Sequence, residues 1–321
     1  MTTRRKFLTQ AGLAAAGLMT LPALAGLAGA LNVTGGSAAG KALHGAAPHD
    51  DATAAARKKG MIGLQLYSLR DQLPLDVKGW IAKVSQAGYT NVETFGLSED
   101  SKYWGLDPAS FKSLLQDNHL VSTSGHYGMD EYLIHGTEGD LKKYIDAIHA
   151  LGQTYLTIPY LNADIRKTED DWKAIAAKFN AIGTRLKSEG IKLGYHNHNF
   201  EFAPVGNTRG LDILLQNTDP SLVHFESDLY WVVRGGADPI DLFHKYPGRF
   251  VMWHLKDMDK AQTDLNTEIG NGSIDFKKIF QYAKLAGLQQ TFMEQENYSA
   301  GMDPYTSISQ SAAYIKNNLV G

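Results

Sequence analysis

The chain has 321 residues, no cysteine and a formal net charge of -3. This length is enough for one large hydrophobic core or two smaller ones, and a slightly acidic balance disfavours a nucleic-acid-binding surface, which is usually basic. The absence of cysteine from the sequence excludes disulfides, thiolate metal ligands, cysteine nucleophiles and a lipid anchor on cysteine. Oxidising and reducing compartments both remain possible.

Residues 1–30 are typical of a twin-arginine export signal. Arg4 and Arg5 precede an apolar run rich in Ala, Gly and Leu, from about residue 11 to residue 30. The alternative, a membrane anchor, would need a longer and more hydrophobic run. Small residues at 23–25 and 28–30 are candidate cleavage sites. We therefore expect a periplasmic or secreted protein with no stable membrane association after cleavage.

Residues 31–59 are rich in Ala, Gly and His and show no periodicity, which predicts a flexible linker. From residue 60 onward, short apolar runs alternate eight times with helical patterns. The predicted strands are 62–66, 91–95, 120–124, 155–159, 192–196, 223–228, 250–254 and 290–294. The predicted helices are 77–87, 108–117, 139–151, 170–188, 211–216, 239–245, 276–286 and 305–318.

This alternation, with short connections, predicts a parallel sheet. Eight units over residues 60–321 match a single-domain α/β fold, the closed (β/α)8 TIM barrel, in number and size. An open doubly wound sheet is the alternative. Such a sheet would usually carry a glycine-rich phosphate-binding turn after its first strand, and Gln65-Leu66-Tyr67-Ser68 is not one.

Polar side chains gather where the predicted strands end, and TIM barrels carry their active sites at these ends. His196, Asp228, His254 and Glu294 fall on strands five to eight. Mixed imidazole and carboxylate ligands suit Mn, Co, Fe, Zn or Ni better than Ca. We therefore predict one divalent metal ion on these four residues. His198, on the same strand face as His196, is the alternative ligand from strand five.

The same strand ends supply candidates for catalysis and substrate binding. Glu294 and His198 are predicted to move protons, and Lys256 to polarise a substrate oxygen; the alternative for Lys256 is a salt bridge with Asp257. The predicted substrate contacts are Gln65, Tyr67, Glu93, His126, Trp231 and Glu296. The two glycines in residues 268–276 allow a phosphate cradle, but a turn followed by a helix capped by Asp275 is favoured.

The order of these motifs resembles the xylose isomerase-like sugar isomerase/epimerase superfamily, which includes inosose dehydratases and ketose 3-epimerases. The motifs are Gly63-Leu64-Gln65-Leu66-Tyr67-Ser68, Val92-Glu93, Tyr195-His196-Asn197-His198, Asp228-Leu229-Tyr230-Trp231, His254-Leu255-Lys256-Asp257 and Met293-Glu294-Gln295-Glu296. The resemblance implies a metal on Glu, Asp, His and Glu of strands five to eight. The last three correspond to Asp228, His254 and Glu294. His196 stands where the epimerases have glutamate, a pattern closer to the dehydratase-like branches.

The resulting functional prediction is a metal-dependent sugar isomerase or epimerase that acts on a sugar or keto sugar through a metal-stabilised enediolate. One alternative is a lyase that cleaves a 3-keto-glycoside or a keto-inositol by β-elimination at the same site. A phosphodiesterase similar to the endonuclease IV branch is disfavoured by the acidic balance. A non-catalytic periplasmic sugar-binding protein is the alternative from another class. The expected partner is a small carbohydrate, with no nucleic acid and a possible homo-oligomer.

Overall fold

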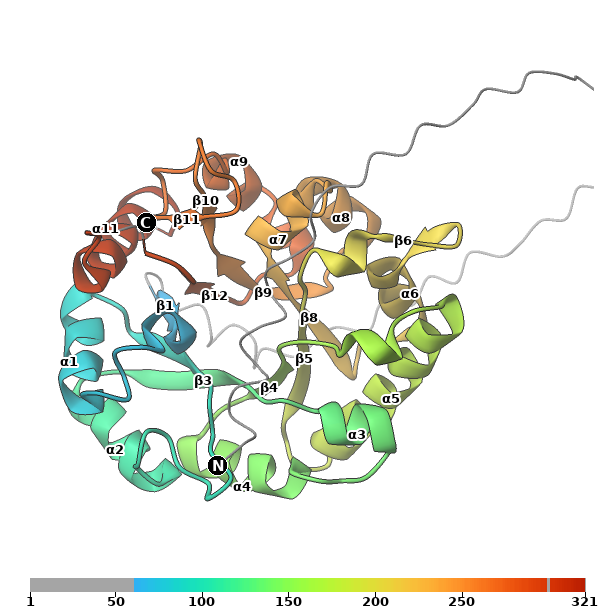
Figure 1. Ribbon diagram of the computed structural model, residues 1–321, viewed down its shortest axis with the longest axis horizontal. Coiled ribbons are helices and arrows are strands. Elements are labelled where there is room, and N and C mark those ends of the chain that lie inside the picture. The colour runs from blue at the N-terminus through green and yellow to red at the C-terminus, as the bar shows by residue number, and fades with distance from the viewer. Residues whose placement is uncertain (1–60, 299–300, 321) are drawn as a thin grey trace, which may run out of the picture. The chain divides into compact units, whose positions relative to one another are not determined.

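The computed structural model describes residues 61–298 and 301–320, so the predicted signal peptide and linker lie outside the described residues. In the described part, eight parallel strands close into a barrel in the order β1-β12-β9-β8-β5-β4-β3-β2 (Figure 1). The strands are β1 (Gly63–Gln65), β2 (Asn91–Thr94), β3 (Val121–His126), β4 (Tyr155–Ile158), β5 (Lys192–His196), β8 (Val223–Asp228), β9 (Phe250–Leu255) and β12 (Gln290–Met293). The predicted (β/α)8 TIM barrel is confirmed.

Helices surround this barrel on the outside (Figure 1). They are α1 (Val77–Ala87), α2 (Pro108–Asp117), α3 (Asp130–His135), α4 (Leu141–Leu151), α5 (Glu169–Lys187), α6 (Gly210–Asn217), α7 (Leu229–Arg234), α8 (Pro239–Lys245), α9 (Phe276–Phe280), α10 (Ala283–Ala286) and α11 (Pro304–Asn318). Their starts follow local chemistry. The longest, α5, begins with a reciprocal capping box in which Thr168 and Asp171 each accept the other's backbone N–H.

The main differences from the sequence prediction concern β3, the helix predicted at 276–286 and two additional short helices. The predicted third strand is too short, because β3 continues to His126. The single helix predicted at 276–286 is wrong: the chain tightens after α9, where Tyr282 N donates to Ile279 O at 3.0 Å, three residues back, and α10 follows separately. The short helices α3, which begins four residues after the end of β3, and α7, which directly follows β8, lie outside the predicted helices.

An apolar layer lies on the same inward strand face as the polar strand ends. Met252 is two residues before His254 on β9, so the two side chains share a face. Met252 packs in a buried cluster with Tyr155, Val251 and Phe292. The polar residues at the carboxyl ends of the strands therefore rest on close-packed hydrocarbon, which keeps their side chains away from bulk water on that side.

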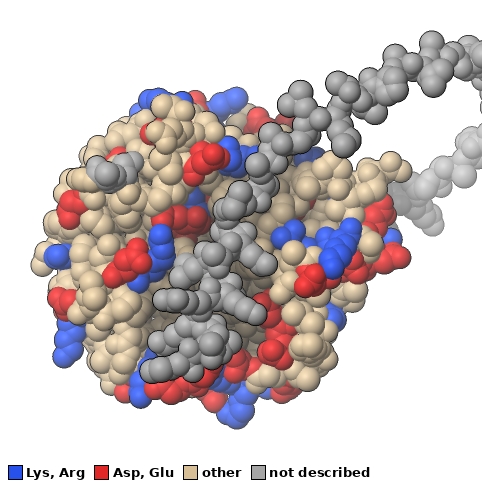
Figure 2. Space-filling model, in the orientation of Figure 1, with Lys and Arg blue, Asp and Glu red and all other residues tan. Residues whose placement is uncertain are grey.

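The described surface carries charges of both signs. Figure 2 shows Lys and Arg interspersed with Asp and Glu on the visible face of the described residues. No helix within 61–298 and 301–320 has the length and apolar character needed to cross a membrane. Two small hairpins, β6–β7 (Pro204–Val205 with Thr208–Arg209) and β10–β11 (Asp257–Met258 with Asn266–Thr267), decorate the loops after β5 and β9.

Candidate active site

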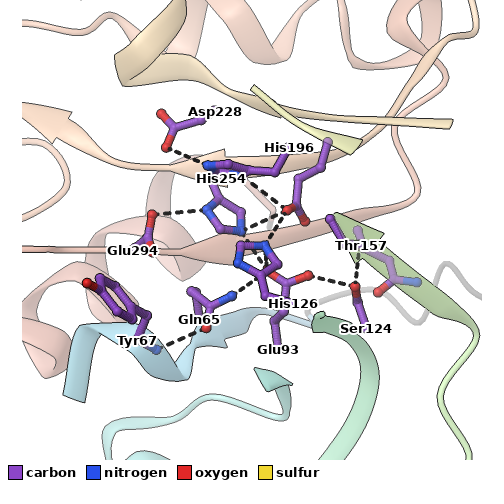
Figure 3. A network of polar contacts seen from close by, with 12 residues as sticks. Gln65, Tyr67, Glu93, Ser124, His126, Thr157, His196, Asp228, His254 and Glu294 are labelled. Atoms are coloured by element: carbon purple, nitrogen blue, oxygen red, sulfur yellow. Dashed lines mark hydrogen bonds and ion pairs between the residues drawn. The ribbon is translucent and has the colours of Figure 1, made fainter. Parts of the chain in front are cut away.

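The barrel brings the four predicted metal ligands together. His196, Asp228, His254 and Glu294 are all buried, and each offers a ligand atom within 4.8 Å of the others (Figure 3). They come from the ends of the neighbouring strands β5, β8, β9 and β12. The parallel sheet is the reason for this meeting, because carboxyl ends of parallel strands all open at one end of a barrel. We call this group the outer cluster.

Distances within the outer cluster are close to the spacing of ligand atoms around one tetrahedral ion, about 3.4 Å. His254 Nδ1 lies 3.1 Å from Glu294 Oε2, and His196 Nε2 lies 3.8 Å from Asp228 Oδ2. Oxygen Oδ2 of Asp228 forms an ion pair but receives no directed hydrogen bond from the described residues, so a lone pair stays available. Two imidazoles and two carboxylates are a donor set that fits Mn, Fe, Co, Ni or Zn.

Asp228 is held in place by its position at the start of α7. Its Oδ1 accepts the backbone N–H of Trp231 at 3.0 Å, as a helix N-cap does, and its own backbone N–H donates to Asn197 Oδ1 at 3.2 Å. One carboxylate oxygen therefore caps the helix while the other faces the cluster. The capping role and the predicted ligand role are compatible.

Lys256 lies beside the outer cluster and is fully buried. Its Nζ is 2.9 Å from Asp228 Oδ2, 2.7 Å from Glu294 Oε2 and 2.6 Å from Glu296 Oε1. Burial favours the neutral amine, but the three carboxylates outweigh burial and hold the pKa of Lys256 well above its usual value. Burial likewise opposes ionisation of Glu294, yet Lys256 and His254 keep the pKa of this carboxyl well below its usual range.

The alternative salt bridge between Lys256 and Asp257 is wrong. The carboxylate of Asp257 instead accepts four backbone N–H groups, from Met258 at 2.9 Å, Gly270 at 2.9 Å, Gly272 at 3.1 Å and Ile274 at 3.2 Å. The amides that a phosphate cradle would offer are thus used by the chain's own carboxylate. Asp275 caps α9 through the N–H of Lys278 at 3.0 Å, so the turn-and-cap prediction is confirmed.

His198 borders the outer cluster, with its ring 5.1 Å from that of His196, and also packs in an aromatic stack. Its ring lies parallel to Phe200, at 5.5 Å between ring centroids and 6° between planes, and 5.5 Å from the ring of Trp231. Burial, with the nearby Lys256 charge, lowers the pKa of His198 to about 3, so the imidazole is neutral at physiological pH. Its Nδ1 is buried without a hydrogen-bond partner among the described residues.

A second polar layer lies deeper in the barrel, around the carboxylates of Glu93 and Glu226, which we call the inner carboxylates. Both side chains are fully buried. Oxygen Oε2 of Glu226 lies 2.9 Å from His126 Nε2, 3.2 Å from His254 Nε2 and 3.3 Å from His196 Nδ1. Glu93 accepts from Gln65 Nε2 at 2.8 Å and Ser124 Oγ at 2.6 Å (Figure 3).

Burial and charge set opposite protonation preferences in this layer. Burial and the neighbouring Glu93 raise the pKa of Glu226 to about 7. Burial disfavours charge on His126, but Glu93 and Glu226 raise its pKa to about 9. For His196 no charge outweighs burial, and the adjacent His254 lowers its pKa further, well below the usual value. The imidazole of His196, whose Nδ1 faces Glu226, is therefore neutral at physiological pH.

The structure separates the predicted substrate contacts into two groups. Gln65 and Glu93 are fully buried and bonded to each other, and His126 lies with them in the inner layer. Tyr67, Trp231 and Glu296 are more exposed and border the outer cluster. The sequence places Glu226 with Asp228 at the end of strand six, but the prediction gave Glu226 no role in the site. Its position two residues before Asp228 on one strand is the signal that could have found it, because alternate strand residues share a face.

Residues 81–318 match the family described as the xylose isomerase-like TIM barrel. The chain belongs to the xylose isomerase-like TIM barrel family. An inosose dehydratase of Lacticaseibacillus casei is 25% identical over 267 residues, which span 73% of this chain and 87% of that protein. The curated relatives in this family include further inosose dehydratases, such as one from Geobacillus kaustophilus that is 24% identical over 271 residues, covering 73% of this chain and 85% of that protein.

Solved structures similar to this chain include one described as an enzyme and one described with a bound metal. A structure described as a sugar phosphate isomerase/epimerase from Parabacteroides distasonis ATCC 8503 is 31% identical, has a TM-score of 0.73, and covers 86% of this chain and 100% of that chain. A structure of the IOLI protein with a bound zinc atom shares the fold at 10% identity, with a TM-score of 0.64, covering 81% of this chain and 99% of that chain. These relatives include enzymes, which supports an enzymatic function for this chain.

Proposed function

We propose that this protein is a divalent-metal-dependent lyase that acts on a keto sugar or keto polyol. It removes a proton from the carbon next to the carbonyl (the α-carbon) and eliminates an oxygen substituent from the β-carbon. The observation that carries this proposal is the buried outer cluster, two imidazoles and two carboxylates, with the Lys256 ammonium 2.7 Å from Glu294. A carbohydrate substrate and a periplasmic or secreted location belong to the same proposal.

His196, Asp228, His254 and Glu294 are the residues that would hold the ion. When bound, a divalent ion supplies Lewis-acid polarisation of a substrate carbonyl. The chain's own groups supply the proton chemistry. Glu294 stays ionised because its pKa is low, which makes it available as the general base. Lys256 keeps its charge and stabilises negative charge that develops on a substrate oxygen.

His198 is assigned to bind an oxygen of the substrate. It is a neutral imidazole beside Trp231, and the unpartnered Nδ1 leaves it free to exchange a hydrogen bond with a substrate oxygen. In the proposed step the C–H bond breaks toward Glu294, a C=C bond forms, and the C–O bond breaks. Glu294 then returns the abstracted proton to the departing oxygen, which leaves as water from a keto polyol, or as an alcohol from a keto glycoside.

Elimination is preferred to isomerisation for two reasons. The curated relatives of this chain are inosose dehydratases. In addition, His196 stands at the strand-five position where the resemblance places a carboxylate in the epimerases, so the second carboxylate that moves a proton in those enzymes has no counterpart at this position. The second candidate, an isomerase or epimerase, is supported by the 31% identical Parabacteroides structure described with that activity.

The experiment combines metal analysis with reaction in D2O. The purified protein is loaded with Mn, Co or Zn, freed of excess ion, and incubated with an inosose and with a 3-keto-glucoside. A lyase releases water or the alcohol and gives an unsaturated product, whereas an isomerase or epimerase incorporates deuterium and keeps the mass otherwise unchanged. His254→Ala and Glu294→Ala should lose both metal and turnover.

His135→Ala is the matched control, because His135 is an exposed histidine at the end of α3. It should keep the metal content and the activity of the unchanged protein. Failure of the wild-type chain to retain any of these ions, or equal metal content in all variants, would refute the proposed site and favour a sugar-binding protein without chemistry. Metal retention without proton exchange or elimination on either substrate would refute the proposed reaction.

A further inference from the structure

The two imidazoles of the outer cluster each face two ways. His254 directs Nδ1 toward Glu294, at 3.1 Å, and Nε2 toward the inner carboxylates, at 2.7 Å from Glu93 and 3.2 Å from Glu226. His196 directs Nε2 toward Asp228, at 3.8 Å, and Nδ1 toward Glu226, at 3.3 Å. Every ring nitrogen therefore faces a carboxylate oxygen, and Glu226 is the carboxylate that both rings share.

We propose that Glu226 is a positioning residue that sets the tautomers of His196 and His254 and so aims their lone pairs into the outer cluster. The proposal rests on the proposed metal site. A neutral imidazole carries one proton, and the nitrogen that keeps it is the one with a hydrogen-bond acceptor. Glu226 then holds the proton of His196 on Nδ1. His254 would have to give up one of its two ring protons to bind metal, and Glu226 with Glu93 holds the remaining proton on Nε2. The opposite nitrogens, His196 Nε2 and His254 Nδ1, are left to bind metal.

The geometry favours this role over direct ligation by Glu226. Ligand atoms about 2.1 Å from one tetrahedral ion lie about 3.4 Å apart. The two shortest inner contacts are well below this spacing and of hydrogen-bond length, 2.7 Å between His254 and Glu93 and 2.9 Å between His126 and Glu226. The corresponding contacts between candidate ligands of the outer cluster are longer, 3.1 Å and 3.8 Å. Three imidazole nitrogens also converge on one oxygen, Oε2 of Glu226, which is the arrangement of an acceptor with several donors.

His126 completes the arrangement. Its Nε2 lies 2.9 Å from Glu226 and 3.2 Å from Glu93, so one ring tethers both inner carboxylates. Neighbours of metal-bound histidines of this kind usually change metal affinity by about 10–100-fold when they are removed. Glu226 serves two candidate ligands at once, so its loss should weaken both.

Glu226→Gln is the test. The amide keeps the volume but presents N–H donors where Oε2 now accepts, so it cannot accept from three rings. The dissociation constant for Zn2+, measured by competition with a chromophoric chelator, should rise about 10–100-fold while one ion per chain still binds. The absorption spectrum of the Co2+-loaded variant should shift, because its imidazoles are reoriented. Glu226→Asp, which keeps the charge, should recover part of the affinity.

Thr157→Val is the matched control, since Thr157 is equally buried on β4 and its side-chain hydrogen bond goes to Ser124 at 3.0 Å, not to an imidazole. Its Zn2+ affinity should equal that of the wild type. A second readout needs no metal: 15N NMR of histidine-labelled protein should show His196 protonated on Nδ1 in the wild type and redistributed in Glu226→Gln. This measurement tests the positioning role of Glu226 without metal. A wild-type protein that binds no metal would refute the proposed metal site but not the positioning role.

Two outcomes would overturn the proposal. One is an unchanged His196 tautomer in Glu226→Gln, or a Zn2+ affinity equal to that of the Thr157→Val control. The other is a reversed dependence, in which Asp228→Asn keeps the ion while Glu226→Gln and His126→Gln abolish binding. That result would make Glu226 a ligand of an ion in the inner layer.

Discussion

Replacement of Lys256 by methionine should strongly destabilise the metal-free protein. Methionine keeps the chain length and the apolar stem but removes the ammonium, which contacts three carboxylates at 2.6–2.9 Å. Glu296 is 30% exposed and regains water, whereas Asp228 is 0% and Glu294 4% exposed and cannot. Two buried carboxylates then lose their counter-charge. Breaking a buried ion pair from one side costs about 3–5 kcal/mol of unfolding free energy.

The assay is urea unfolding of chelator-treated protein at neutral pH, followed by tryptophan fluorescence. In a thermal melt of a domain of this size, the same loss of 3–5 kcal/mol would lower the Tm by roughly 6–20 °C. Lys245→Met is the control, because Lys245 is 49% exposed and pairs with Asp212 at 2.8 Å on the surface. Its loss should cost less than about 1 kcal/mol. Adding Mn2+ or Zn2+ should restore more stability to Lys256→Met than to the wild type, since an ion replaces the missing positive charge.

The difference between the variant and the wild type should also shrink as the pH falls. Burial raises the pKa of Asp228, and without Lys256 this carboxyl takes up a proton more readily, which removes the uncompensated charge. The reasoning fails if Lys256→Met loses no more stability than Lys245→Met at neutral pH. It also fails if the loss is the same at every pH where the protein is folded.

Three further predictions concern stability. His126 should contribute up to about 3 kcal/mol to the stability that the metal-free protein loses as the pH rises from 6.5, the ordinary pKa of histidine, to about 9, the raised pKa of His126. Urea titrations at several pH values should show a shallower slope for His126→Gln, with the part that comes from the raised pKa of His254 still present. Tyr195→Phe removes the hydroxyl that donates to buried Glu201 and should cost about 1–3 kcal/mol by chemical unfolding; no loss would show that the bond contributes nothing. Gly63→Ala places a Cβ against the ring of Phe292 on β12 and should cost about 1–3 kcal/mol in a thermal melt. Gly128→Ala, with no described heavy atom within 4 Å, should stay within about 0.5 kcal/mol, and equal melting temperatures would contradict the argument.

Local patterns in the sequence were enough to predict the barrel. Apolar runs and helical periodicity report which segments are strands and helices, and both depend on neighbours only a few residues away. The bounds of β5 and β8 agree with the predicted strands at 192–196 and 223–228. The split of the helix at 276–286 did not follow from the pattern, because helical periodicity continues through a tight turn that only the hydrogen bonds reveal.

The sequence also placed His196, Asp228, His254 and Glu294 at neighbouring strand ends, since a strand's last residue and the order of parallel strands are both linear properties of the chain. It did not decide what each side chain faces. Only the tertiary structure shows that Asp257 accepts hydrogen bonds from backbone amides at 270–274. Lys256 therefore pairs with Glu296 and with the carboxylates of the outer cluster instead of with Asp257. Only the closed barrel brought Glu226 under two imidazoles from other strands. Such contacts join residues that are far apart in the sequence. A carboxylate that is buried away from water must accept hydrogen bonds from the donors on the surrounding strands, so its partners depend on the tertiary structure.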